Sequence, residues 1–244
     1  MIDLVAAECL KLRTPRLLHG MIPAALAISL AAVAGTVLSA ADAGALESTE
    51  GIREVFGIAG AGVILVLVVG IIISAGEYRH GTAADTFLTT PRRHLVLAAK
   101  LAVGAGVGLA AGAAISVACV GMATLLYNVK GATVPFDDVE VWLALAGMLV
   151  YATLFAVVGV AFGSLVRNQT LAVAGALAWF AIIEHTLVNL VPDVGRWLPA
   201  AAGEAILRAP LDGLLSPLAG TALLATYGAA IAVAGIRVEA TRDA

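Results

Sequence analysis

Residues 55–75 decide the fold of this chain: they read VFGIAGAGVILVLVVGIIISA and contain no charged side chain. A helix needs about 20 residues to cross a hydrocarbon core about 30 Å thick. The whole composition agrees with this stretch. Of the 244 residues, 61% are hydrophobic and 13% are charged, whereas soluble proteins average roughly 45–50% and about 25%. The sequence therefore predicts an all-α integral membrane protein.

Six stretches have the length and apolar character of membrane spans. They are residues 17–39, 55–75, 95–127, 141–163, 171–191 and 217–236. The third is longer than a span requires, which favours a tilted helix or one that begins in the interface. The first is too long for the core of a signal peptide, which has about 7–15 residues, so we expect it to be retained. The remaining segments are short, and we expect one membrane domain over residues 1–244.

Basic residues predict the orientation of these spans. With a cytoplasmic N-terminus, ten of the 14 lysines and arginines lie in inside segments: Lys11, Arg13, Arg16, Arg79, Arg92, Arg93, Lys100, Arg167, Arg237 and Arg242. The other four lie outside: Arg53, Lys130, Arg196 and Arg208. Because cytoplasmic loops are enriched in Lys and Arg, we expect both termini in the cytoplasm.

Residues 2–13, before the first span, have the pattern of an amphipathic helix. Ile2, Val5, Cys9 and Leu12 recur at helical spacing, with Leu4 on the same face, whereas Glu8 and Lys11 lie mostly off it. Too short and too polar to cross a bilayer, such a helix is expected to lie in the cytoplasmic interface. The alternative is an unstructured cytoplasmic tail.

Residues 76–94, GEYRHGTAADTFLTTPRRH, form a more elaborate connection than a short turn. Thr82 and Asp85 have the spacing of a capping box, so a short helix is expected to begin at Ala83. Phe87 and Leu88 lie on one face of it, and Pro91 ends it. An exposed apolar face on a cytoplasmic helix is expected to contact either a partner protein or the lipid headgroups.

The ordered set EYRHGT (77–82), TTPRR (89–93) and Lys100 resembles the cytoplasmic loop of ABC-2 type permeases, the transmembrane domains of type V ABC exporters. The resemblance extends over the whole chain, because the N-terminal helix, the six spans and the long segment between spans five and six match that layout. It implies that residues 82–90 are a coupling helix seated on an ATPase. The coupling residues it implies are Glu77, Arg79, Gly81, Thr82, Asp85, Phe87, Leu88, Pro91 and Arg92.

The resemblance also implies the partners: cytoplasmic ABC ATPase subunits, and a second permease copy that is either identical or a related chain. The sequence contains no G-x-x-x-x-G-K-[ST] phosphate loop, so ATP and Mg²⁺ would be bound by the partner ATPase and no cofactor by this chain. Membrane lipid is a further expected partner. The net charge of −3 gives no reason to expect nucleic acid.

Charged residues near the second span allow two interpretations. Glu77 and Arg79 either form a charge pair that transmits ATPase motion or are two solvated charges at headgroup level. Lys100 is expected to anchor the third span by reaching toward the interface. Arg167, Asn168 and Gln169 form a short inside turn, expected to be a polar hairpin or a second contact with the ATPase.

The fifth span carries ionisable residues at membrane depth, which are costly unless they face protein or water. Glu184 and His185 lie in its outer half, followed by Asn189. Either these residues line the transport pathway or lock a dimer interface, or they form a structural pair that bonds the segment 192–216.

Residues 192–216 are too apolar for a free outer loop and too interrupted to span. We expect two short re-entrant helices, over residues 199–207 and 211–215, because irregular backbone at membrane depth needs protein or water beside it. Trp197 suits the interface. The resemblance implies that this segment is an outer gate, with Glu184, His185, Asn189 and Trp197 as pathway or gate residues.

Gly104, Gly108 and Gly112 recur every four residues on the third span, a small-residue seam that indicates close helix contact within or between subunits. The two cysteines, Cys9 and Cys119, are expected at different depths, as free buried thiols rather than a disulfide or a metal site.

The expected function is that of a permease subunit of an ABC exporter in a bacterial cell membrane. It would move a hydrophobic or amphipathic substrate, such as a lipid, an antibiotic or a peptide, with ATP hydrolysed by a separate subunit. The alternatives are a non-ABC channel or carrier and a membrane anchor or sensor. A membrane enzyme is disfavoured, because the four histidines are scattered and neither H-E-x-x-H nor G-x-S-x-G occurs.

Overall fold

The computed structural model describes residues 1–12, 16–80 and 93–241, and every regular element in these ranges is a helix. The all-α prediction is therefore confirmed. Six helices are long and apolar enough to cross a membrane: Gly20–Ser39, Thr49–Arg79, His94–Val129, Val139–Val166, Gln169–Val188 and Pro217–Val238. They indicate a multi-pass membrane protein.

The elements follow one another along the chain as short helices between long ones. The N-terminal part comprises α1 (Ile2–Lys11), α2 (Arg16–Ser39), α3 (Ala43–Glu47), α4 (Thr49–Ile58), η1 (Ala59–Gly62) and α5 (Val63–His80). The two longest helices are α7 (Arg93–Val129) and α8 (Val139–Val166). The C-terminal part comprises α9 (Gln169–Ala178), the π-helix η2 (Trp179–Glu184), α10 (His185–Leu190), α11 (Pro192–Gly195), α12 (Pro199–Ile206) and α13 (Pro217–Thr241).

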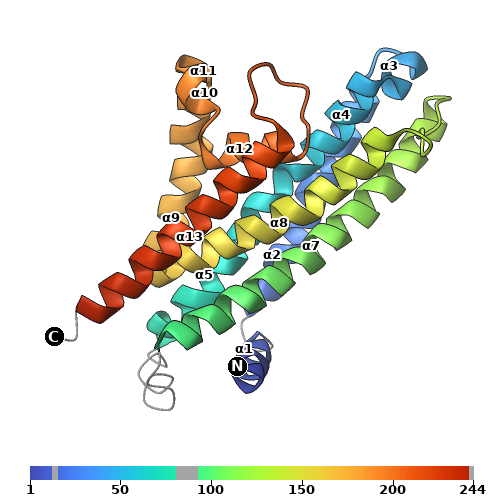
Figure 1. Cartoon of the computed structure of the whole chain (residues 1–244). Coiled ribbons are helices and arrows are strands. Elements are labelled where there is room, and N and C mark those ends of the chain that lie inside the picture. The colour runs from blue at the N-terminus through green and yellow to red at the C-terminus, as the bar shows by residue number, and fades with distance from the viewer. Residues whose placement is uncertain (13–15, 81–92, 242–244) are drawn as a thin grey trace.

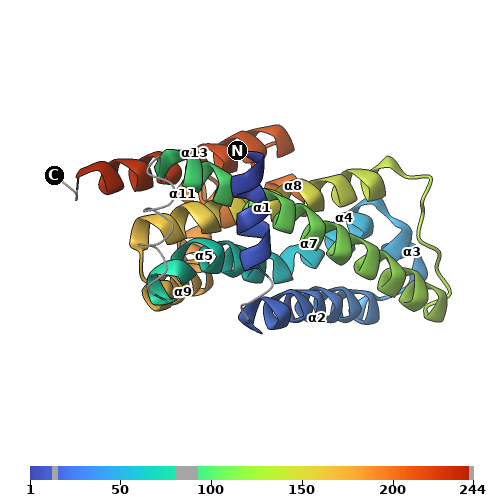
Figure 2. The same cartoon turned by 90° about the horizontal axis from the view of Figure 1, so that it is seen from below.

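The long helices form a tilted bundle with α8 at its centre, packed against α5, α7 and α13 (Figure 1). α2 packs against α7 and the α4–η1–α5 segment. One end of the bundle carries α1 and the ends of α5 and α7 that flank residues 81–92, and we call it the α1 end. The opposite end, the α3 end, carries α3 and α4 together with α11 and α12 (Figure 1), and Figure 2 views the bundle from the α1 end.

Glycine lets the central helices approach to backbone contact. A Cβ atom on Gly70 of α5 would lie 2.2 Å from the carbonyl oxygen of Ala156, and one on Gly159 of α8 would lie 2.1 Å from that of Leu67. Both distances are far below van der Waals contact, so only glycine permits this approach of α5 and α8.

The predicted glycine seam of the third span faces α8 of the same chain. A Cβ on Gly108 would lie 2.6 Å from the carbonyl oxygen of Ala152, and one on Gly112 would lie 3.0 Å from its Cβ. Gly104 faces Val160 in the same way. Of the two interpretations, contact within the subunit therefore describes these three residues.

Two boundaries differ from the sequence expectation for a local reason. The second apolar helix begins at Thr49 rather than residue 55, because the Ser48 side chain accepts a hydrogen bond from Gly51 N and caps α4. The fifth span, expected as one helix over 171–191, contains a π-helical turn over Trp179–Glu184. Such turns have no simple sequence signature and rotate the side chains that follow them.

The segment 192–216 contains two short helices, one of which was expected. α12 (Pro199–Ile206) confirms the helix predicted over residues 199–207, whereas residues 211–215 are not helical and the other short helix is α11. α12 ends before Arg208, which has a φ of 59°, and Gly213 has a φ of 80°. Both values lie in the left-handed region, which reverses the chain and prevents a second helical turn.

Candidate functional site

α1 is held to the bundle by four charged side chains, which we call the α1-end cluster: Glu8, Lys11, Glu77 and Lys100. Glu8 Oε1 lies 2.6 Å from Lys11 Nζ, and its Oε2 lies 2.8 Å from Lys100 Nζ. Glu77 Oε1 lies 2.6 Å from Lys11 Nζ and 2.9 Å from Lys100 Nζ. Each carboxylate therefore contacts both lysines.

The α1-end cluster is electrically balanced and mostly buried. The side chains of Glu8 and Lys100 are 6% and 7% exposed, and that of Glu77 is 11% exposed. Lys11 is the most exposed member of the cluster, and 42% of its side chain is accessible to solvent. Burial lowers the pKa of Lys11, but its hydrogen bonds to Glu77 and Glu8 outweigh this and raise the pKa above its ordinary value of 10.5. The ammonium group therefore stays charged near neutral pH.

The cluster joins three helices around residues 81–92. Glu77 lies in the last turn of α5 and Lys100 in the second turn of α7, and these two helices flank that segment. Glu8 and Lys11 bring α1 to the same place. Most of the predicted coupling residues lie outside the described residues: Gly81, Thr82, Asp85, Phe87, Leu88, Pro91 and Arg92.

Two sequence interpretations at this end, those of Glu77 and of Lys100, are wrong. Glu77 pairs with Lys11 and Lys100, and no described contact joins it to Arg79, which is exposed. Lys100 is buried between the carboxylates of Glu8 and Glu77 and is not an exposed anchor.

α1 turns Glu8, and not Ile2 or Cys9, toward the bundle. Ile2 is 85% exposed and Cys9 is exposed, whereas Glu8, placed off the apolar face, is buried. The two lysines that meet Glu8 explain this, because a satisfied ion pair can be buried where an unpaired carboxylate cannot. Cys119 is buried and free, as expected, but Cys9 is not buried.

The α3 end carries a second group, the α3-end cluster of Arg53, Glu140 and Arg208. Arg53 Nε and Nη2 donate to the two carboxylate oxygens of Glu140 at 3.1 and 3.0 Å. Arg208 Nε and Nη2 lie 2.9 and 3.1 Å from the same two oxygens. One carboxylate thus joins α4, α8 and the residues after α12 by two bidentate pairs.

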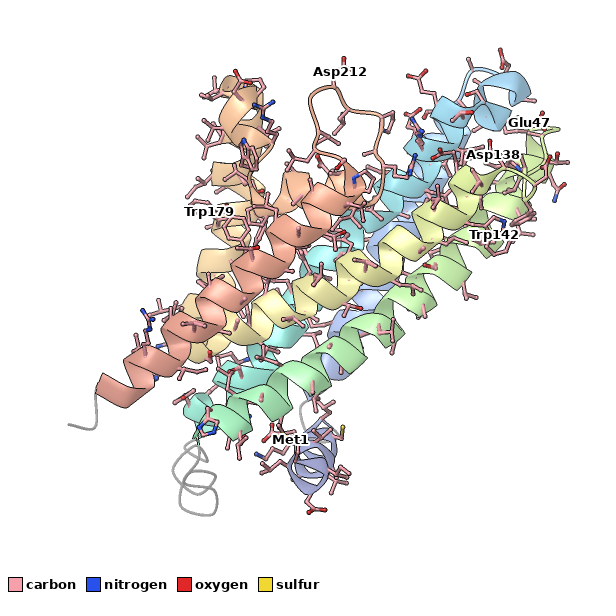
Figure 3. The ribbon with its side chains drawn as sticks, viewed as in Figure 1. Met1, Glu47, Asp138, Trp142, Trp179 and Asp212 are labelled. Atoms are coloured by element: carbon pink, nitrogen blue, oxygen red, sulfur yellow. The ribbon has the colours of Figure 1, made fainter. Side chains whose placement is uncertain are left out.

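Further hydrogen bonds join the loops of the α3 end. Lys130 Nζ donates to the carbonyl oxygens of Leu38 and Ala40 at 2.8 and 3.1 Å, which caps the end of α2. Glu47 accepts from Thr133 N at 2.7 Å. Glu47, Asp138 and Trp142 lie together at this end, and Met1 lies at the other (Figure 3).

Glu184 is buried, with 1% of its surface exposed, and its carboxylate accepts a hydrogen bond from Ala200 N at the start of α12. Glu184 therefore contacts the segment 192–216, which is the part of the second sequence interpretation that the described side chains show. The side chains of His185 and Asn189 lie outside the described ones. Trp197 is 51% exposed, and its carbonyl oxygen accepts from Tyr227 Oη at 3.1 Å.

The turn at Arg167–Gln169 is a capped hairpin. Arg167 ends α8 in the left-handed conformation, with a φ of 55°, and its guanidinium lies 5.8 Å from the centre of the Tyr78 ring. Asn168 caps α9 by accepting from Leu171 N at 3.1 Å. In the described ranges, no group of three or more His, Cys, Asp and Glu side chains could hold a metal ion.

Sequence reasoning missed Glu8, Arg53, Glu140 and Arg208 as members of ion clusters. The available signals were local: Glu8 and Lys11 have the i,i+3 spacing of a helical ion pair, and Glu140 is an acid in the first turn of an apolar helix. The partners lie 87 residues apart for Arg53 and Glu140 and 92 apart for Glu8 and Lys100, so no local pattern connects them.

The fold is all-α, its six long apolar helices indicate a multi-pass membrane protein, and ion clusters join these helices at both ends of the bundle. Comparison with known proteins adds no family, because the chain matches no known protein family, no curated protein and no solved structure.

Proposed function

We propose that this chain is the permease subunit of an ABC-2 type exporter, with both termini in the cytoplasm of a bacterial cell. A partner ATPase would bind residues 81–92, and a second permease copy would complete the pathway. The observation that carries the proposal is the α1-end cluster, which links α1, α5 and α7 around this segment.

A loop that receives force from a partner must pass it to the spans. The α1-end cluster supports this role, because Glu77 and Lys100 tie the two helices that leave the loop, and Glu8 adds α1 to the same unit. Rigid linkage of three helices favours movement as one body over local bending of the loop. The substrate is proposed to be hydrophobic or amphipathic, which suits the apolar composition.

The test is co-purification of the chain with the ATPase encoded beside it, comparing the original sequence with Phe87→Asp. A charge on the apolar face of the proposed coupling helix should reduce the recovered ATPase at least tenfold and abolish permease-dependent ATP turnover. Phe136→Asp is the matched control, because Phe136 is also exposed, at 43%, but lies at the α3 end. It should leave the association unchanged.

The contrary outcomes point to the alternative classes. If the purified chain carries no ATPase, or if Phe87→Asp and Phe136→Asp behave alike, the proposal is wrong and a channel, carrier or sensor is favoured. A cysteine at position 85 should also react with an impermeant maleimide only after the membrane is opened. Reaction in intact cells would place the loop outside and contradict the proposal.

A further inference from the structure

At the α1 end of the bundle, the last turn of α8 lies between α9 and α13. Both helices pack on α8 but make few contacts with one another, and they lie on either side of it (Figure 2). The spans that contain them are little buried: 19% of the apolar window of Gln169–Val188 and 28% of that of Pro217–Val238 are buried, against 78% for Thr49–Arg79. Leu165 and Val166, the last residues of α8, are accordingly only half-buried.

Apolar side chains border this place on both sides. Leu171, in the first turn of α9, is 64% exposed, and Val233 and Ile236 of α13 are 48% and 37% exposed. α13 reaches the level at which α8 ends, because a Cβ on Gly235 would lie 2.8 Å from Ser164 Oγ. In a membrane, apolar side chains on the outside of a bundle contact the acyl chains of lipids.

Two arginines lie at this level, and they are held differently. Arg167 ends α8 in the left-handed conformation, with a φ of 55°, where a glycine would avoid the strain. Its guanidinium lies 5.8 Å from the centre of the Tyr78 ring, so its positive charge has a fixed place. Arg237 follows Gly235 by two residues and is exposed. One guanidinium is thus positioned by the protein, and the other is accessible from outside.

The N-terminus of α9 adds positive potential at the same place. Asn168 caps this helix by accepting from Leu171 N at 3.1 Å, and the ten residues of α9 begin directly after Asn168. The N-terminal end of a helix carries a partial positive charge, which favours anions beside it. The α1-end cluster has two carboxylates and two ammonium groups, so this cluster does not offset the potential.

We propose that α8, α9 and α13 bind an anionic phospholipid at the α1 end. The phosphate contacts Arg237 and faces the N-terminus of α9, and Arg167 supplies a fixed positive charge behind it. The acyl chains lie along Leu171, Val233 and Ile236. Basic groups between the ends of membrane helices are a common way to bind anionic headgroups, and the adjoining apolar side chains favour a lipid over a free phosphate ion.

This lipid site goes beyond the proposed function and does not depend on it. In the proposed orientation the site lies in the cytoplasmic leaflet. Binding needs no ATPase, so the lipid site and the exporter proposal can fail separately.

The experiment titrates phosphatidylglycerol or phosphatidylcholine into the full-length chain, delipidated in detergent, and counts the bound lipid by native mass spectrometry. Phosphatidylglycerol should bind about tenfold more tightly, since its headgroup has a net negative charge. Arg237→Gln should weaken its binding about fivefold, the ordinary effect of one basic residue, and Arg167→Gln by a similar factor. Arg237→Lys keeps the charge and should lose less than Arg237→Gln. Equal affinity for the two lipids in the original chain overturns the proposal.

Two arginines outside the site are the matched controls. Arg79 is exposed at the same end, but on α5, which packs on α8 and makes few contacts with α13. Arg196 is 42% exposed at the α3 end. Arg79→Gln and Arg196→Gln should leave the affinity for phosphatidylglycerol unchanged. A loss in Arg79→Gln as large as that in Arg237→Gln would reveal diffuse attraction by the whole end, and it would overturn the site.

Two further measurements distinguish a lipid from a free anion. A large excess of inorganic phosphate should leave the binding of phosphatidylglycerol unchanged, and competition would contradict the assignment of a lipid. Leu171→Ser should weaken the binding of both lipids by the same factor, because it removes a contact with the acyl chains. Unchanged binding of both lipids would contradict this part of the site. If Arg167→Gln is not monodisperse, Arg237→Gln and Arg237→Lys decide the outcome.

Discussion

An ion cluster joins the helices at each end of the bundle, and the two clusters differ in their charge balance and in their exposure. The α1-end cluster has two carboxylates and two ammonium groups, and three of its four side chains are 11% exposed or less. The α3-end cluster has one carboxylate between two guanidinium groups, and its arginines are 38% and 28% exposed. The cluster with equal numbers of positive and negative groups is the more buried one, and the cluster with an excess positive charge is the one whose arginines contact solvent.

This difference follows from the cost of moving charge out of water. A buried ion pair is tolerated only when its charges are compensated and hydrogen-bonded, whereas a partly exposed arginine keeps some of its hydration. We therefore expect the α1-end cluster to behave as one rigid unit that does not tolerate the loss of a member. The α3-end cluster should tolerate partial loss, because its arginines can turn toward water.

The largest effect is expected for Lys100→Met, which leaves Glu8 and Glu77 with a single lysine. An uncompensated buried charge costs about 3–5 kcal/mol, and the free energy of unfolding, measured by SDS titration, should fall by this order. The double variant Glu8→Leu/Lys100→Met keeps only the neutral pair of Lys11 and Glu77. It should recover at least half of the loss, and a further loss instead would show that charge balance is not what stabilises this end.

A smaller effect is expected for Glu140→Gln at the α3 end. Both arginines lose a charged acceptor but can turn toward water, so the loss should be about 1–2 kcal/mol. Raising the salt concentration from about 0.1 M to about 1 M should reduce this loss, and should hardly change that of Lys100→Met. Asp137→Asn is the control, because Asp137 is exposed in the turn just before α8, three residues from Glu140. Equal salt dependence at the two ends would contradict the comparison.

The smallest effect concerns Lys11, the open member of the balanced cluster. Its pKa is raised in the folded protein, so its contribution to stability is complete below the ordinary value of 10.5 and is lost as the pH rises through the higher folded value. The stability difference between the original chain and Lys11→Met should therefore be constant from pH 7 to 10 and shrink above that. A difference that grows with pH in the same scan would reverse the assigned sign.

Part of the fold could be predicted because its cause is local. The all-α class and the six long apolar helices follow from runs such as residues 55–75, since a segment of this length without charge is most stable as a helix in lipid. The start of α12 at Pro199 was also predictable, because proline fits the first turn of a helix. The π-helical turn at Trp179–Glu184 and the missing helix at 211–215 depend on packing and chain reversal, which leave no comparable pattern.

The candidate sites were less predictable for the same reason. Glu77 and Lys100 were recognised as charges near a helix end, but the residues that bind them were not. The burial of Glu8 was not predicted, since the apolar periodicity of residues 2–13 gives no weight to a carboxylate whose partner lies 92 residues away.

By itself, the sequence determined that this chain is helical, with six segments long and apolar enough to cross a membrane and polar groups near their ends, because hydrophobicity and helix length are properties of continuous segments. Only the tertiary structure decided which of those groups meet: Glu8 with Lys100, Arg53 and Arg208 on Glu140, and Glu184 with the start of α12. The physical reason is that these contacts join residues far apart in the sequence. A buried charge is stable only beside its counter-charge, and the packing of α1, α5, α7 and α8 brings such partners together.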